Sequence, residues 1–105
     1  MDVKKLKEMV IDKGLEEKSI LGFWNSLNRY SAEKREDFEN VFPNYDKELV
    51  SVYVNTVSLT MTSWPDEDYI HIVLRLEIRY GSQFAADYRM VFNLDGTIED
   101  DYLTF

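Results

Sequence analysis

The hydrophobic pattern of this chain changes its period near residue 45. Before that point, apolar side chains recur every three or four residues, as they do on one face of a helix. The helical stretches cover residues 2–13, 15–30 and 32–41. After that point, apolar and polar residues alternate, which is typical of strands with one buried face. The alternating runs cover residues 49–64, 69–80, 84–94 and 97–105.

The order of these elements predicts the fold class. We expect an α+β domain in which three N-terminal helices, within residues 1–42, pack on one face of a curved antiparallel β-meander of four long strands, within residues 48–105. No repeat or linker interrupts the chain, so residues 1–105 are expected to form one domain.

Local signals predict where the helices end. Gly14 is suited to stop the first helix, Ser31 to cap the start of the third, and Pro43 to end it. Trp24 lies on the apolar face of the second helix, where we expect it to pack in the core.

The turns predict how the strands pair. A four-residue loop, 65–68, would pair Trp64 with Tyr69 and Met61 with Ile72. This register keeps apolar residues opposite each other on the core face.

The turn at Asp95-Gly96 reads as a type I turn with a left-handed glycine. It would pair Asn93 with Thr97 and Phe92 with Ile98, and so keep the apolar face continuous.

Two further points concern register. A three-residue loop after Tyr80 would pair it with Phe84 but would place like charges opposite each other, whereas a five-residue loop would pair Arg79 with Asp87. Both remain open.

In the first strand the apolar residues change from even to odd positions after residue 54, which predicts a bulge or bend near residues 55–56.

Composition fits a folded cytoplasmic protein. The 105 residues are 45% hydrophobic and 30% charged, and they include no cysteine, which excludes disulfides and thiolate metal ligands. The N-terminal stretch is charged and amphipathic, without the apolar core of a signal peptide or a membrane span. We therefore expect a cytoplasmic location without membrane association.

The net charge is -8, and most of the excess lies in the sheet half. Residues 1–49 carry 9 basic and 11 acidic side chains, whereas residues 50–105 carry 3 basic and 9 acidic ones. Because no lysine follows Lys47, a phosphate-binding surface is not expected there. The acidity argues against nucleic acid as a ligand and is consistent with simple solubility or with a basic protein partner.

Motifs for catalysis, metal binding or cofactor binding are not evident, and we expect a protein that is not an enzyme. His71 is the single histidine; the pattern places it on the outer sheet face, across from Thr62. The acidic run 99–101 lacks the ligand spacing of a calcium loop.

Asp100 is the most unusual acidic residue, because strict alternation places it among core-facing residues. It could then line a ligand pocket together with Tyr88, Tyr102 and Trp24. The alternative is a bulge at residues 100–101, which would turn Leu103 and Phe105 inward instead.

The outer face of the sheet mixes apolar, aromatic and arginine side chains, the types enriched at interfaces. The residues concerned are Trp64, Tyr69, Val73, Arg75, Arg89 and Val91. We expect this face to bind a partner protein or a second copy of the chain, with an open solvated sheet as the alternative.

Residues 88–100, a strand followed by Asp95-Gly96 and a strand that opens with Ile98, resemble the final meander of NTF2-like α+β proteins. The resemblance is confined to this part of the C-terminal meander. It implies a curved sheet, a pocket between the sheet and the helices, and dimerisation through the sheet. It fixes no activity, and Asp100 is the only position that it implies as a pocket aspartate.

Two functions are therefore expected. The first is a non-catalytic protein-interaction domain, such as an adaptor or an inhibitor, which uses the acidic sheet half or the outer face. The alternative is a small-molecule-binding or hydrolytic NTF2-like domain with Asp100 in a pocket.

Overall fold

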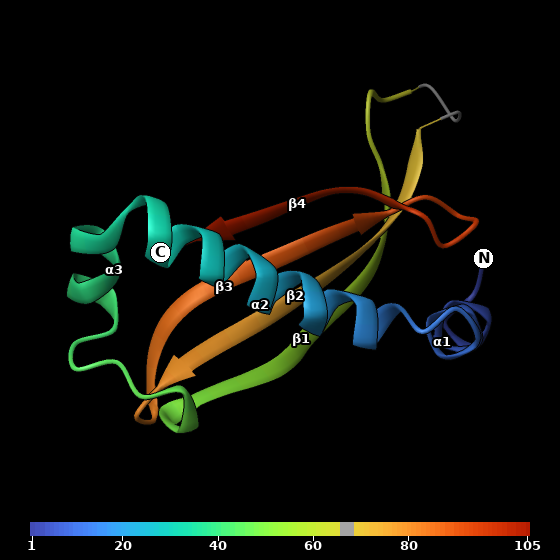
Figure 1. The fold of residues 1–105 in the computed structure, drawn as a ribbon. Helices are drawn as coiled ribbons and strands as arrows, with labels where there is room; N and C mark the ends of the chain where they lie inside the picture. The colour runs from blue at the N-terminus through green and yellow to red at the C-terminus, as the bar shows by residue number, and fades with distance from the viewer. Residues whose placement is uncertain (66–68) are drawn as a thin grey trace.

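The computed structural model describes residues 1–65 and 69–105, and it has the predicted α+β architecture (Figure 1). The helices are α1 (Val3–Asp12), α2 (Leu15–Glu33), α3 (Arg35–Val41) and a short 3-10 turn, η1 (Lys47–Leu49). The strands are β1 (Val50–Met61), β2 (Ile70–Tyr80), β3 (Gln83–Phe92) and β4 (Ile98–Thr104). They form one open antiparallel sheet in the order β1-β2-β3-β4.

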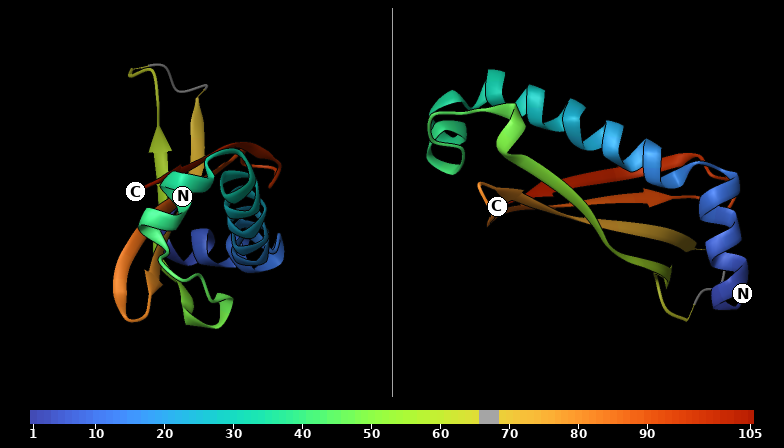
Figure 2. Two further views of the ribbon diagram at one scale, coloured as in Figure 1. Left: turned by 60° about the vertical axis from the view of Figure 1, so that its left-hand side comes forward. Right: turned by 90° about the horizontal axis from the view of Figure 1, so that it is seen from below.

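The helices form a second layer on one face of this sheet. The long helix α2 packs over β2, β3 and β4, while α1 and α3 lie at its two ends (Figures 1 and 2). Strand β1 is the edge strand on the side of the sheet away from β4. Its place in the sheet matters for the site described below.

The predicted stop at Gly14 is confirmed, because it separates α1 from α2. Asp2 caps α1 by accepting a hydrogen bond from the Lys5 amide at 2.8 Å. Gly14 follows α1 with a φ of 61°, a left-handed conformation that glycine adopts at low cost. This sharp turn lets α2 begin at Leu15, whose side chain is fully buried.

The prediction that Ser31 caps the third helix is wrong. Helix α2 continues through it to Glu33, and the break falls at Lys34. The Ser31 hydroxyl donates to the Asn28 carbonyl one turn earlier, at 2.8 Å. A serine hydroxyl that bonds to a carbonyl of the preceding turn can lie within a helix, at a slight cost in helix stability.

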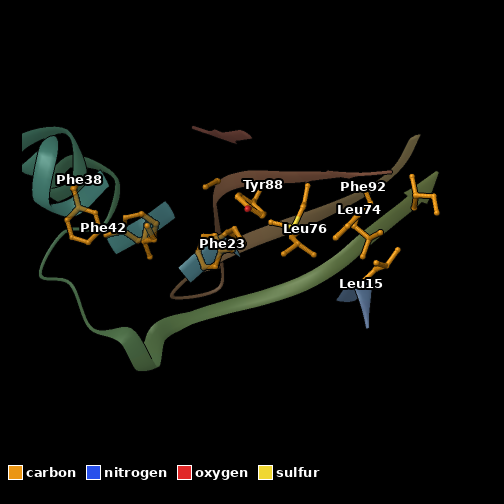
Figure 3. Close-up of a cluster of buried hydrophobic side chains, with 13 residues drawn as sticks. Leu15, Phe23, Phe38, Phe42, Leu74, Leu76, Tyr88 and Phe92 are labelled. Atoms are coloured by element: carbon orange, nitrogen blue, oxygen red, sulfur yellow. The ribbon is translucent and has the colours of Figure 1, made fainter. Parts of the chain in front are cut away.

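The core lies between α2 and the sheet and extends to α3 (Figure 3). Leu15 meets the Leu74–Phe92 end of it, and Phe23 packs edge-on against the Tyr88 ring at 5.9 Å. Its fully or nearly fully buried members are Leu15, Phe23, Leu27, Phe38, Phe42, Ile72, Leu74, Leu76, Ile78, Ala86, Tyr88, Met90 and Phe92. Trp24, expected in the core, packs against this cluster but is only partly buried.

The β1–β2 register differs from the prediction by two residues. Met61 pairs with Ile70 rather than Ile72, and the Thr62 amide donates to the Tyr69 carbonyl at 2.9 Å, so Trp64 lies beyond the ladder. A slip of two residues keeps every side chain on its face, so the hydrophobic pattern cannot detect it. Part of the predicted loop, residues 66–68, lies outside the described residues.

The same slip places His71 opposite Thr60 rather than Thr62. The predicted irregularity in β1 is confirmed, because the register shifts between Val54 and Thr56. Asn55 is the extra residue of this bulge.

The β2–β3 hairpin follows the three-residue register over most of its length. Arg75 pairs with Arg89 and Glu77 with Asp87, which leaves like charges opposite each other. The Arg75 Nε bonds diagonally to the Asp87 Oδ1 at 2.7 Å, which neutralises both charges and raises the pKa of Arg75. Near the turn a further shift pairs Tyr80 with residue 83 instead of residue 84.

The predicted pairing of Phe92 with Ile98 across the β3–β4 turn is confirmed. The Asn93 amide donates a hydrogen bond to the Thr97 carbonyl at 2.9 Å. The register then shifts, and Asp100 pairs with Val91. Glu99 is the bulged residue, one position earlier than the predicted bulge. The shift reverses the faces of all later residues in β4.

Candidate functional site

The four residues of the predicted pocket lie on two different faces of the sheet. Tyr88 is fully buried on the helix-covered face, where Phe23 contacts both its ring and that of Trp24. Asp100 and Tyr102 lie on the outer face, where the Tyr102 hydroxyl donates to the Asp100 Oδ2 at 2.8 Å and the pKa of Tyr102 is raised by that bond. Asp100 does not face the core: of the two predicted alternatives the structure has the bulge, which turns Asp100 outward and Leu103 toward the core.

Asp101 occupies the inward position instead. Its Oδ2 accepts hydrogen bonds from the Tyr88 hydroxyl at 2.6 Å and from the Ser26 hydroxyl at 3.0 Å, and the Arg29 Nη2 donates to the Ser26 oxygen at 3.3 Å. Burial, and then the bond to Asp101, raise the pKa of Tyr88. The Tyr88 hydroxyl therefore keeps its proton. Ser26, Tyr88 and Asp101 form a polar group that joins α2, β3 and β4.

Gly22 allows this approach of α2 to the sheet. A Cβ at this position would lie 2.6 Å from the Tyr88 hydroxyl oxygen and would also collide with the Met90 methyl group. A glycine inside a helix costs up to about 1 kcal/mol of stability relative to alanine. At this position glycine lets the α2 backbone come into close contact with the Tyr88 side chain.

A surface depression of about 390 Å³ lies beside this polar group. The Tyr30 ring stacks on the C-terminal Phe105 ring at 4.6 Å to form one part of it. Its lining residues are Ser26, Arg29, Tyr30, Glu33, Lys34, Leu103 and Phe105. Ser26 is the member shared with the polar group.

The outer face brings together four of the residues predicted as an interface. Val73 pairs with Val91, and Arg75 pairs with Arg89. Trp64 is 80% exposed and lies beyond the β1–β2 ladder. Binding through this face stays a prediction, and the Arg75–Asp87 ion pair already satisfies part of its charge.

Strand β1 differs from the other strands in that its core-facing side is only half covered. Val57 and Leu59 are 36% and 39% exposed, although their cross-strand partners Leu74 and Ile72 are fully buried. Val54 and Met61 are exposed to the same degree. These four residues, Val54, Val57, Leu59 and Met61, are called the β1 strip below.

The β1 strip opens toward α1. An apolar groove of about 370 Å³ lies between them, with Lys7 and Glu16 as its charged residues. Its other lining residues are Val3, Leu6, Val10, Ile11 and Val57. Val3 and Ile11 are largely exposed, so the apolar surface continues from the strand onto the helix.

The two edges of the sheet differ in charge. The twelve residues of β1 contain no charged side chain and no proline, whereas β4 carries Glu99, Asp100 and Asp101. Natural proteins usually protect a free edge with charges, prolines or very short strands, because its unpaired N–H and C=O groups can bind another strand. β4 has that protection, and β1 has only its bulge.

Within residues 1–65 and 69–105, no cluster of three or more acidic or histidine side chains is arranged to hold a metal ion. The same part of the chain contains no helix with the length and hydropathy of a membrane span. A comparison with protein-family models, with curated proteins and with solved structures finds no match to this chain.

Sequence reasoning did not single out β1 as a site. It assigned interface character to the outer face, because aromatic and arginine side chains alternate there. The signal for β1 was present in the sequence, because none of the residues 50–61 is charged. The predicted meander already makes this run an edge strand, but the sequence pattern does not show that α2 leaves it half covered.

Proposed function

We propose that this protein is a non-catalytic interaction domain that binds another polypeptide chain along the β1 edge. The observation that carries this proposal is the β1 strip, four apolar side chains left 36–39% exposed beside a free, uncharged strand edge. A strand added to β1 would bond to its free backbone groups and cover the strip at the same time.

The energetics support binding through this surface. Burying an apolar side chain completely contributes about 1.5–3 kcal/mol, so covering the remaining third of four side chains contributes about 2–4 kcal/mol. No charge on β1 has to be removed from water. The adjoining groove, lined by Val3 and Ile11, adds apolar contact area next to Val57.

A photoreactive amino acid at Leu59 tests the proposal in cells that produce the protein. Leu94 is the matched control, because it is 40% exposed and lies in the turn between β3 and β4. We expect irradiation to give a discrete protein adduct from position 59 and none from position 94. Equal labelling at the two positions, or none at position 59, would contradict the proposal.

The second candidate function is a small-molecule-binding domain of the NTF2-like kind. It is supported by the Ser26–Asp101–Tyr88 group beside the depression with Arg29 and Tyr30. A ligand there would be an aromatic acid or amine, because the lining offers stacked rings and charges of both signs.

Benzoate and benzylamine are suitable probes for this second candidate. Binding would shift the amide NMR signals of Ser26 and Leu103 in wild type but not in a Ser26→Leu variant, in which leucine fills the depression. The absence of shifts with either probe at millimolar concentration would remove the support for this candidate.

A further inference from the structure

We infer that the chain bound along β1 is a second copy of this protein, paired antiparallel through β1 about a two-fold axis normal to the sheet. This inference rests on the proposed function and names the partner. A two-fold axis in that direction keeps the helical layers of both copies on the same side of an eight-stranded sheet. The two β1 strips would then lie side by side at the axis, where Val54 of each copy meets Val57 of the other.

The position of the bulge makes β1 complementary to itself. The strand has twelve residues, and its register shift falls at Asn55, next to its midpoint. In a regular twelve-residue strand, end-to-end antiparallel pairing with its own copy would place core-facing side chains opposite outer-facing ones. The extra residue of the bulge corrects this mismatch.

With the bulge, full overlap places apolar residues opposite apolar residues on the core face. Val54 would lie opposite Val57 of the second copy, and Val52 opposite Leu59. The remaining core-facing pair is Val50 with Met61. All of these residues face the helix layer in the monomer, because they pair with the alternating apolar residues of β2.

Charge also favours self-association at this edge over the other. Two copies of a chain with net charge -8 repel each other, and pairing through β4 would bring their acidic runs together. The β1 edge contributes no charge to either side of the contact. Pairing two copies through β1 therefore brings no carboxylates of the paired strands together, whereas pairing through β4 would.

Sedimentation or light scattering of the purified chain tests the inference. We expect a species of about 25 kDa, twice the 12.5 kDa chain, at a protein concentration of about 100 µM. The double variant Asn55→Asp and Ser58→Asp places four carboxylates beside the axis, so we expect a monomer with unchanged circular dichroism. The control, Asn25→Asp with Asn28→Asp on the exposed side of α2, adds the same charge and should remain dimeric.

Cysteine cross-linking provides a second measurement that does not depend on weakening the dimer. Because the chain has no cysteine, mixing Val52→Cys with Leu59→Cys chains reports directly on the expected pair. We expect oxidation to give a disulfide-linked dimer from this mixture. A Thr104→Cys chain, which labels the β4 edge, should form no disulfide-linked dimer under the same oxidation.

A monomer at every concentration, or a dimer unaffected by the Asn55 and Ser58 changes, would overturn the inference. If the chain is monomeric but position 59 still forms an adduct with a different protein in cells, the second copy is excluded and the proposed function stands. If position 59 forms no adduct and the chain is monomeric, both fail.

Discussion

The hydroxyl of Tyr88 on β3 donates a 2.6 Å hydrogen bond to the Asp101 carboxylate on β4, directly beneath Gly22 of α2. The bond joins the consecutive strands β3 and β4 beneath a helix from the other half of the chain. Since Tyr88 is fully buried, this one phenol has no solvent to replace its acceptor. The Tyr88 hydroxyl explains why α2 has a glycine at position 22, and it predicts that the free energy of unfolding depends on pH.

Replacing Tyr88 with phenylalanine removes the hydroxyl and leaves the ring in place. We expect the free energy of unfolding at neutral pH to fall by about 1–2 kcal/mol, because Asp101 loses its shortest hydrogen bond. Urea unfolding followed by circular dichroism measures this. A Tyr53→Phe variant is the control and should be nearly neutral, because Tyr53 is exposed on the outer face of β1, opposite Glu77.

The raised pKa of Tyr88 predicts lower stability at alkaline pH. An unfolded tyrosine ionises near pH 10, whereas the folded Tyr88 keeps its proton to higher pH, so its contribution is fully present below about pH 10 and is lost above it. The difference in unfolding free energy between wild type and Tyr88→Phe should therefore shrink from pH 8 to pH 11. A difference that stays constant or grows over this pH range would contradict a raised pKa for Tyr88 in the folded protein.

Gly22→Ala should destabilise the protein although alanine favours helices. The new methyl group would lie 2.6 Å from the Tyr88 oxygen, and such overpacking typically costs about 1–3 kcal/mol, more than the helical gain of about 1 kcal/mol. Thermal unfolding with Asn25→Ala as the exposed α2 control measures the effect. Combining Gly22→Ala with Tyr88→Phe should recover part of the loss; strict additivity would show that the two positions are not coupled.

Gly96→Ala tests the turn between β3 and β4. Gly96 has a φ of 89°, and an added Cβ would lie 2.7 Å from the Lys13 side chain. We expect a loss of about 1–2 kcal/mol from the left-handed conformation, and a further loss from the contact. Gly81→Ala is the matched control, because Gly81 also has a positive φ but has open space around its Cβ position. Equal losses at the two glycines would show that the Lys13 contact adds nothing.

Tyr80→Phe should loosen the connection between α3 and β1. The Tyr80 hydroxyl accepts a hydrogen bond from the Asp46 amide at 2.8 Å and lies 3.2 Å and 3.1 Å from the carbonyl oxygens of Pro43 and Asn44. Without it, we expect faster hydrogen exchange at the Asp46 amide and a loss of about 1–2 kcal/mol. Unchanged exchange at Asp46 would mean that other contacts order this segment.

The limits of prediction from sequence are clearest in β4. The Asp95-Gly96 turn correctly predicted the pairing of Phe92 with Ile98, because turn chemistry fixes pairing locally. It did not decide between strict alternation and a bulge, and so left open whether Asp100 or Asp101 would face α2. That choice depends on a bulge placed where an inward carboxylate can meet the hydroxyls of Ser26 and Tyr88, which are 75 and 13 residues away in sequence.

The sequence by itself determined the elements of this protein: its three helices, its four strands, the bulge in β1 and the uncharged character of residues 50–61. These follow from hydrophobic period and turn chemistry, which act over a few neighbouring residues. Only the tertiary structure decided that α2 would cover β2, β3 and β4 and leave the β1 strip half exposed. The position of a helix across a sheet depends on contacts between distant parts of the chain, such as that of Gly22 with the Tyr88 side chain. The hydrophobic pattern of neighbouring residues does not predict such contacts.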